Sequence, residues 1–240
     1  MRVTQNGNLL QLTWFPHFFP VNCYLVIEDN ELTLIDAAMP FSVKGIVAAA
    51  AKLQKPITRI ILTHAHGDHV GALDELKRQL PAAKVYISER DADLLRGDRT
   101  LRADEPQMPL KGSVPKNITT VPDVLLQEGG LIGSLQAIST PGHTPGSMSF
   151  MDQRSRALIA GDAYQTFRVT AVAGTIVPLF PFPAMATWHK ESALASALKL
   201  AELSPAVLAA GHGNMLTEEP VQAMKLAIRQ AQNSLNKGGR

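Results

Sequence analysis

Residues 63–69 read THAHGDH, which sets three histidines and one aspartate within six residues. The apolar run 59–63 (RIILT) leads into the cluster and an amphipathic stretch follows it, so the pattern predicts a loop between a strand and a helix. Imidazole nitrogens and carboxylate oxygens are the ligands that Zn²⁺, iron and Mn²⁺ accept in proteins. No packing role requires four such side chains together, and the stretch therefore predicts a metal site formed by His64, His66, Asp68 and His69.

Further side chains of the same types occur downstream. His143 lies in TPGHTPG, Asp162 in LIAGDA and His212 in LAAGHGN. A glycine directly precedes each of the three residues. Glycine lets the backbone turn sharply and approach a site closely. Alone, each of the three is also compatible with an ordinary loop, turn or cap residue. With the first cluster they provide enough ligands for two metal ions that share one carboxylate.

This pattern resembles the metallo-β-lactamase superfamily. The resemblance is carried by HAHGDH (64–69), His143, Asp162 and His212, with LIDAA (34–38) upstream. It implies that one metal ion is held by His64, His66 and His143, a second by Asp68, His69 and His212, and that Asp162 bridges the two. It also implies that Asp36 supports the site without binding metal, the alternative being a turn residue at a strand end.

The fold that the resemblance implies is a four-layer αββα sandwich, in which two mixed β-sheets pack face to face with helices outside. Apolar periodicity predicts strands at 9–14, 23–27, 32–35, 59–62, 84–87, 131–138, 147–151, 157–160 and 206–208. It predicts helices at 43–54, 69–80, 89–95, 188–203 and 218–235, the last starting at Thr217 with Glu218 and Glu219 in its first turn. We expect one domain over residues 1–240, because no cut leaves the site intact.

Composition bears on partners and location. The formal net charge is +2, without the strong basic field that nucleic-acid binding favours, so we expect a small-molecule substrate and no nucleic acid. The single cysteine, Cys23, excludes an internal disulfide and suits a cytoplasmic location, and we expect no signal peptide. We expect a monomer or a homodimer.

Two long segments without clear periodicity remain. Residues 169–188 carry no charge, but Pro178, Pro181 and Pro183 would break a spanning helix, so we expect no membrane partner and an apolar loop over the site. Residues 92–122 are polar and proline-containing, and either a lid or a surface excursion fits them.

Two metal ions bridged by Asp162 would hold a hydroxide between them that attacks an electrophilic carbonyl carbon. We predict a dinuclear metal-dependent hydrolase of a small ester, lactone or thioester, with Zn²⁺ as the metal and Fe or Mn as alternatives. Asp68 and Asp162 are the candidate catalytic residues, since their carboxylates can orient water or accept protons. A small-molecule phosphodiesterase, an iron-dependent oxidoreductase and a binding protein with a degenerate site are the alternatives. The candidate substrate-binding side chains, which core packing explains equally well, are Phe167, Phe180, Phe182 and Trp188.

Overall fold

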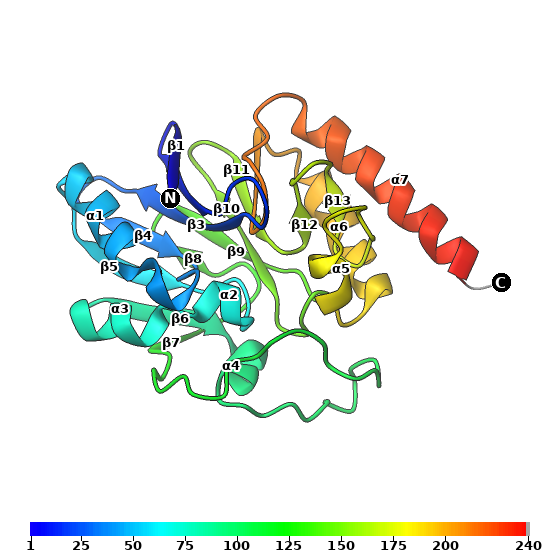
Figure 1. Cartoon of the computed structure of the whole chain (residues 1–240), viewed down its shortest axis with the longest axis horizontal. Helices are drawn as coiled ribbons and strands as arrows, with labels where there is room; N and C mark the ends of the chain where they lie inside the picture. Colours follow the sequence, from blue (N-terminus) through cyan, green and yellow to red (C-terminus); the bar gives the residue numbers. More distant parts are fainter. Residues whose placement is uncertain (239–240) are drawn as a thin grey trace.

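Two stacked β-sheets form the centre of the molecule, and the computed structural model describes them within residues 1–238 (Figure 1). The first sheet contains, side by side, β1 (Arg2–Asn6), β2 (Leu9–Trp14), β3 (Val21–Ile27), β4 (Leu32–Ile35), β5 (Ile57–Ile61), β6 (Lys84–Ser88) and β7 (Val124–Leu126). The second contains, in order across the sheet, β14 (Val207–Ala210), β11 (Ala157–Gly161), β10 (Met148–Asp152), β9 (Leu135–Ser139) and β8 (Leu131–Ile132). Both sheets are mixed: β1–β4 are antiparallel and β4–β7 parallel, and β14 runs parallel to β11.

Side-chain alternation along the strands explains the layers. In β3, Tyr24 and Val26 join the apolar layer between the two sheets, whereas Cys23 and Leu25 join the layer beneath the helices of the first sheet. Successive side chains of a strand point to opposite faces, so a strand that is apolar at every position is buried on both faces. Cys23 is fully buried there, as its apolar run predicts.

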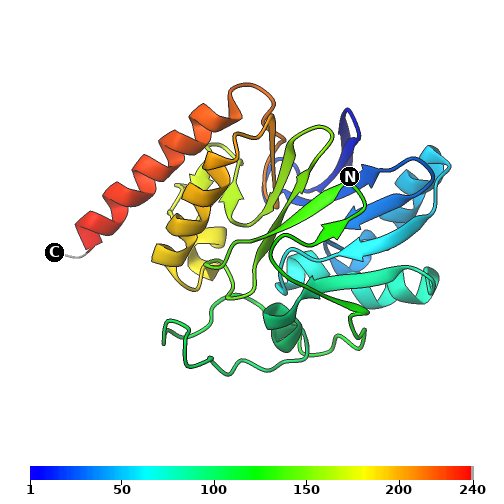
Figure 2. The same cartoon turned by 180° about the vertical axis from the view of Figure 1, so that it is seen from behind.

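Helices cover the outer face of each sheet (Figure 2). The first sheet is accompanied by a short 3-10 turn at Pro40–Ser42 and by α1 (Val43–Leu53), α2 (Gly67–Val70), α3 (Leu73–Gln79) and α4 (Glu89–Leu95). The second half contributes α5 (Phe182–Ala186), α6 (Lys190–Glu202) and α7 (Pro220–Gly238), together with a small ribbon of β12 (Tyr164–Gln165) and β13 (Ala171–Val172). The four-layer αββα arrangement is the predicted one. In the described part of the chain, no helix is both long and apolar enough to cross a membrane.

Three predicted elements were wrong in detail. The helix expected at 69–80 is divided into α2 and α3 near Gly71, where a Cβ would lie 2.7 Å from Cδ of Pro40. The strand expected at 131–138 is a hairpin, in which β8 and β9 turn at Gly133 with a φ of +59°. The helix expected to start at Thr217 begins at Pro220, because Glu219 has a left-handed φ of +46° that no helix continues.

The segment after α4 has neither helix nor strand until β7, and it follows the lower edge of the sandwich in Figure 1. Its start is anchored by buried Arg90, whose guanidinium donates to both carboxylate oxygens of Glu105 and to the carbonyl of Thr100. The segment then returns over the edge of the sheets where the candidate ligands lie.

Candidate metal centre

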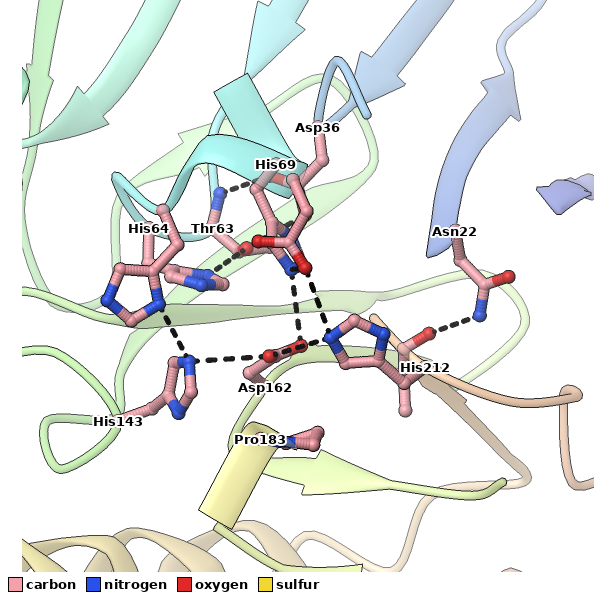
Figure 3. Close-up of polar contacts among 12 residues, drawn as sticks. Asn22, Asp36, Thr63, His64, His69, His143, Asp162, Pro183 and His212 are labelled. Atoms are coloured by element: carbon pink, nitrogen blue, oxygen red, sulfur yellow. Dashed lines mark hydrogen bonds and ion pairs between the residues drawn. The ribbon is translucent and has the colours of Figure 1, made fainter. Parts of the chain in front are cut away.

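All seven candidate ligands lie at one edge of the two sheets, five on loops and two, Asp68 and His69, in the short helix α2. His64, His66, Asp68 and His69 follow β5 and enter α2, His143 lies between β9 and β10, Asp162 follows β11, and His212 follows β14. Each strand ends at this edge, so residues far apart in sequence meet there (Figure 3). Six of the seven are buried, whereas the Asp68 side chain keeps 26% of its surface exposed.

The seven side chains form two separate groups of three, and a third group, His64, His69 and Asp162, links them. One potential ligand atom from each of His64, His66 and His143 lies within 4.8 Å of the others, and the same is true of Asp68, His69 and His212. The Asp162 carboxylate lies between the groups, at 3.3 Å from Nε2 of His143, 3.1 Å from Nε2 of His212 and 3.4 Å from Nε2 of His69 (Figure 3). This is the arrangement that the resemblance implies, and the role of these side chains as ligands stays a prediction.

Each of the five histidines of the cluster has one ring nitrogen held by an oxygen at the periphery of the cluster. The oxygen partners are Thr63 Oγ1 for His64 (3.0 Å), Lys111 O for His66 (3.1 Å), Asp36 Oδ2 for His69 (2.8 Å), Thr187 Oγ1 for His143 (3.1 Å) and Pro20 O for His212 (2.6 Å). A carbonyl or carboxylate partner requires that the facing nitrogen carry the hydrogen, which leaves the other nitrogen with a free lone pair. Metal-binding histidines characteristically have such a partner on the nitrogen that does not bind the ion.

Polar atoms at the centre of the cluster lack partners. Within residues 1–238, His64 Nε2, His69 Nε2 and Asp162 Oδ1 are buried and accept or donate no hydrogen bond. Buried polar atoms are normally paired with a hydrogen-bond partner. Without a bound ion, each of these three unpaired atoms would reduce the free energy of unfolding by about 1–3 kcal/mol. The donor set of imidazoles and carboxylates therefore fits divalent metal ions.

Burial and the carboxylates have opposite effects on the histidines. Burial holds the pKa of His64 well below its usual value and lowers the pKa of His143 to about 3, so both rings are neutral at physiological pH. Burial acts on His69 and His212 in the same direction, but the neighbouring carboxylates, Asp162 foremost, outweigh it and raise the pKa of each ring. The same contacts keep the pKa of Asp162 well below its usual value, against the effect of burial, so it is ionised.

Asp36 supports the cluster from behind, and its backbone is strained to do so. Its carboxylate accepts hydrogen bonds from the backbone N–H of Thr63 (2.7 Å), from the Thr63 hydroxyl (2.8 Å) and from His69 Nδ1 (2.8 Å). Its φ is +62°, a left-handed value that is uncommon for residues other than glycine. Strain of this kind concentrates at functional sites, where the surrounding contacts hold it.

The loop of His212 is anchored by a buried polar network that sequence reasoning missed. Asn22 donates through its side-chain amide to the carbonyls of Ala210 (2.8 Å) and Gly213 (2.7 Å), on either side of His212. The Tyr24 hydroxyl also donates to Ala210 O, at 2.6 Å. Strand β3 of the first sheet thus holds a ligand loop of the second. The only signal in the sequence is a polar Asn22 inside the apolar run VNCYLVI.

A cavity of about 370 Å³ opens onto the cluster. One side is the candidate metal centre, where His66, Asp68, His143, Asp162 and His212 reach its surface. The opposite walls are apolar and consist of Phe19, Met39, Phe182, Pro183 and Ala186, with Ser113 and Gly67 completing the lining. Among the described residues that line this cavity there is no lysine or arginine.

Of the four candidate substrate-binding side chains, Phe182 alone lines this cavity. Phe180 is buried behind it and packs against Phe167 and Phe182, with ring centroids 5.0 and 6.0 Å away. Trp188 is also buried, and its indole N–H donates to the carbonyl of Met108 at 2.9 Å. The segment 169–188 therefore reaches the site through α5, whose residues Phe182, Pro183 and Ala186 face the cavity.

The segment 92–122 also reaches the site. The carbonyl of Lys111 faces His66, the carbonyl of Ser113 accepts from the N–H of Gly67 at 2.8 Å, and a Cβ on Gly112 would overlap the His66 ring. Gly112 has a φ of +80°, so both its conformation and its close approach require glycine. Residues 111–113 are thus part of the wall of the site.

Comparison with known proteins agrees with this geometry. A family model described as the metallo-beta-lactamase superfamily matches residues 17–212. The uncharacterised protein YobT of Bacillus subtilis (strain 168) is 59% identical over 231 residues, which cover 96% of this chain and 99% of YobT. The probable metallo-hydrolase YflN of the same strain is 33% identical, and the match covers 79% of this chain and 78% of YflN.

More distant similarities point in the same direction. A hydroxyacylglutathione hydrolase of Rhodopseudomonas palustris (strain BisB5) is 34% identical over 117 residues, which cover 49% of this chain and 38% of that enzyme. The solved structure of TTHA1623 in a di-iron-bound form superposes with a TM-score of 0.66 at 27% identity, covering 92% of this chain and 97% of that one. The predicted family and fold class are confirmed by these comparisons.

Proposed function

Because the chain belongs to the metallo-β-lactamase superfamily, we propose that it is a dinuclear metal-dependent hydrolase of small acyl compounds: esters, lactones or thioesters. Its relative YflN is named as a probable metallo-hydrolase. The observation that carries the proposal is the set of unpaired, buried ligand atoms at the centre of the cluster, His64 Nε2, His69 Nε2 and Asp162 Oδ1. An imidazole whose outer nitrogen is held by an oxygen presents its other nitrogen to the centre of the cluster, which suits it to bind a metal ion.

We assign the ligands as the two groups suggest. His64, His66 and His143 would hold one ion, and Asp68, His69 and His212 the second, with Asp162 contributing to both. Divalent ions bound there would polarise the substrate carbonyl and lower the pKa of an attacking water toward ~7. Zinc is the proposed metal; iron and manganese accept the same donors.

The two carboxylates have different positions and therefore different roles. Asp162 is buried among three histidines, which keep its pKa low, so it orients its neighbours and does not act as a free base. Asp68 lines the cavity, and its partly exposed carboxylate lies 3.5 Å from Nε2 of His212. We propose that Asp68 orients the attacking water, accepts its proton and passes that proton to the leaving group.

The cavity favours an uncharged acyl substrate. Its apolar walls, Phe19, Met39 and Phe182 among them, suit a hydrocarbon group. A phosphodiester is an anion throughout the reaction, and sites for phosphate commonly add arginine or lysine, which the described lining does not contain. The hydroxyacylglutathione hydrolase relative, whose name denotes a thioester substrate, is consistent with acyl transfer.

An iron-dependent oxidoreductase is the second candidate. One observation favours it: the solved structure of TTHA1623 contains two iron ions in the same fold. The histidine and carboxylate donors of this chain are ligand types that iron also accepts. Metal content and reaction type therefore have to be measured together.

The proposal extends to the whole chain. Because the ligands come from both sheets, we propose one domain over residues 1–240. Buried Cys23, the only cysteine, is compatible with the cytoplasm, which we propose as the location. We expect a monomer or a homodimer that acts on a small molecule.

The test is a substrate panel on protein of known metal content. Metal-free protein is reloaded separately with Zn²⁺, Mn²⁺ or Fe²⁺ and assayed with thioesters, lactones, aryl esters, phosphodiesters and β-lactams. We expect hydrolysis of acyl substrates by protein that carries two ions per chain and none by metal-free protein. Turnover of phosphodiesters alone, or full activity without metal, would contradict the proposal.

A further inference from the structure

We propose that Asp91 is a positioning residue, which holds the loop of His64 and His66 and the loop of His143 at a fixed separation. The inference rests on the proposed role of these three histidines as ligands of one metal ion. It concerns a carboxylate outside the cluster that takes no part in the chemistry described above.

The geometry of Asp91 is that of a bridge. It is the third residue of α4 and is fully buried. Its Oδ2 accepts from the backbone N–H of Ala65 at 2.9 Å and from the Thr144 hydroxyl at 2.8 Å, and its Oδ1 accepts from the N–H of Gly146 at 2.8 Å. Ala65 lies between His64 and His66, and Thr144 directly follows His143. One side chain therefore joins both loops of the first ligand group.

The start of α4 reinforces this bridge. Ser88, the N-cap of α4, accepts from the N–H of Asp91 at 3.1 Å and donates its hydroxyl to the carbonyl of Gly146 at 2.6 Å. A Cβ on Gly146 would lie only 2.6 Å from Oδ1 of Asp91, so this loop approaches the helix as closely as glycine allows. The loop of His143 is thus seated on the first turn of α4.

The carboxylate form of Asp91 matches the groups around it. Two backbone N–H groups and one hydroxyl point at its two oxygens, and an ionised carboxylate has only acceptors. Burial raises the pKa of Asp91 to about 6, while its three donors and the neighbouring Arg90 act in the opposite direction. An asparagine has one acceptor oxygen, and its amide would face one of these donors with another donor.

The contacts of Asp91 lie beside one group of ligands. Within residues 1–238, its carboxylate bonds to Ala65, Thr144 and Gly146, next to His64, His66 and His143, whereas His69 is held by Asp36 and the loop of His212 by Asn22. A change at Asp91 should therefore weaken one metal site and leave the other. A change at a residue that contributed only to global stability would weaken the metal affinity of both sites alike.

The experiment is a two-step metal titration of the full-length protein. Metal-free wild type and Asp91→Asn are titrated with Zn²⁺ against a chromophoric chelator, and with Co²⁺, whose absorption spectrum distinguishes a site with three histidines from one with two histidines and an additional carboxylate. We expect one of the two sites in the variant to weaken about 10- to 100-fold, as is typical when a supporting partner is lost. The weakened site should be the one with the spectrum of His64, His66 and His143, and the other should keep its affinity.

Two controls make the result decisive. Asp152→Asn removes another buried carboxylate, which caps the turn of Arg154 and lies outside the ligand cluster, and it should leave both affinities unchanged. Thr144→Val removes one donor to Asp91 without changing side-chain volume, and should weaken the same site, whereas Thr144→Ser, which keeps the hydroxyl, should retain it. This pair also decides the matter if the Asp91 variant does not fold.

The outcomes separate the two proposals. Wild-type protein that binds fewer than two ions overturns the proposed function. Wild type that binds two ions, with folded Asp91→Asn or Thr144→Val that also binds both at wild-type affinity, overturns the role of Asp91 alone. Equal weakening of both sites, or the same loss in Asp152→Asn, also overturns it, because the effect would then be one of general stability.

Discussion

Oδ2 of Asp36 lies 2.8 Å from Nδ1 of His69, and the same carboxylate accepts two hydrogen bonds from Thr63. Asp36 is therefore bound both to the residue that opens the THAHGDH loop and to the last histidine in it. The contact fixes the hydrogen on Nδ1, so Nε2 is the ring nitrogen of His69 that faces Asp162, at 3.4 Å.

Asp36→Asn should keep the His69 side chain but weaken the hydrogen bond that orients its ring. The amide can still accept from Thr63 but is a weaker partner for His69, so we expect metal affinity and kcat to fall by roughly 10- to 100-fold. Metal content after dialysis against a weak chelator, measured with kcat on the best substrate, tests this. Wild-type values for both quantities would show that the contact is dispensable.

Gly211→Ala should disrupt the site through a single methyl group. A Cβ at Gly211 would overlap Oδ1 of Asp162 and would also lie 2.6 Å from Cε1 of His69, so Asp162 has to move. We expect at least a tenfold loss of metal affinity in a protein that remains folded. Gly97→Ala is the control away from the site: its φ of +89° strains an alanine, but no atom of the described residues beyond its chain neighbours lies within 4 Å of its Cβ position. Its metal affinity should be unchanged.

Phe182→Ala should reduce activity on long acyl substrates more than on short ones. Phe182 lines the cavity and is 53% exposed, so its ring is available to an acyl chain. We expect kcat/KM for an octanoyl ester to fall roughly tenfold, with little change for an acetyl ester. Phe41→Ala is the control, because Phe41 is 57% exposed but does not line this cavity. The same loss for both chain lengths would argue against contact between Phe182 and the acyl group.

Stability should depend on pH through Asp91. Burial raises its pKa from the ordinary 3.8 to about 6, so the folded state binds this proton more tightly than the unfolded state does. Its contribution is therefore most favourable below about pH 4 and is lost as the pH rises through 6, a difference of roughly 3 kcal/mol. Denaturant unfolding of metal-free wild type and Asp91→Asn at several pH values should show this difference between them. Parallel pH profiles would refute it.

Removal of ligands should abolish metal binding and activity together. His64→Ala and Asp162→Ala each remove a side chain that has an unpaired atom facing the centre, and the layers of the fold do not depend on either. We expect loss of bound metal and at least a 10³-fold loss of kcat, with wild-type circular dichroism. His17→Ala is the control, since His17 is exposed and outside the cluster. Substantial turnover by metal-free protein would contradict the mechanism.

The sequence predicted the layers and the residues that meet at the site better than it predicted local boundaries. The predicted limits of β2, β4 and α4 coincide with the observed ones, and α4 begins directly after its N-cap, Ser88. β1 was missed because RVTQN is polar and largely exposed at the edge of its sheet. β7 was missed because its three residues lie at the end of a long polar segment.

The supporting residues of the site were the harder part. The seven candidate ligands have distinctive chemistry, and the structure brings them to one place. Thr63, Thr187 and Asn22 have ordinary side chains, and their importance comes from tertiary contacts that no local pattern encodes. Asp91 is a charged residue in the polar sequence ERDADLL, and no local pattern shows that α4 turns it inward, where it is fully buried.

The distribution of ligand loops between the two sheets has a mechanical consequence. The loop after β5 belongs to the N-terminal half of the chain, and His143, Asp162 and His212 to the C-terminal half. Metal ions bound by ligands from both halves would cross-link the interface between the two halves. Metal binding should then slow the local opening of that interface. Amide hydrogens beside it should exchange with solvent more slowly than those at the far edges of the sheets.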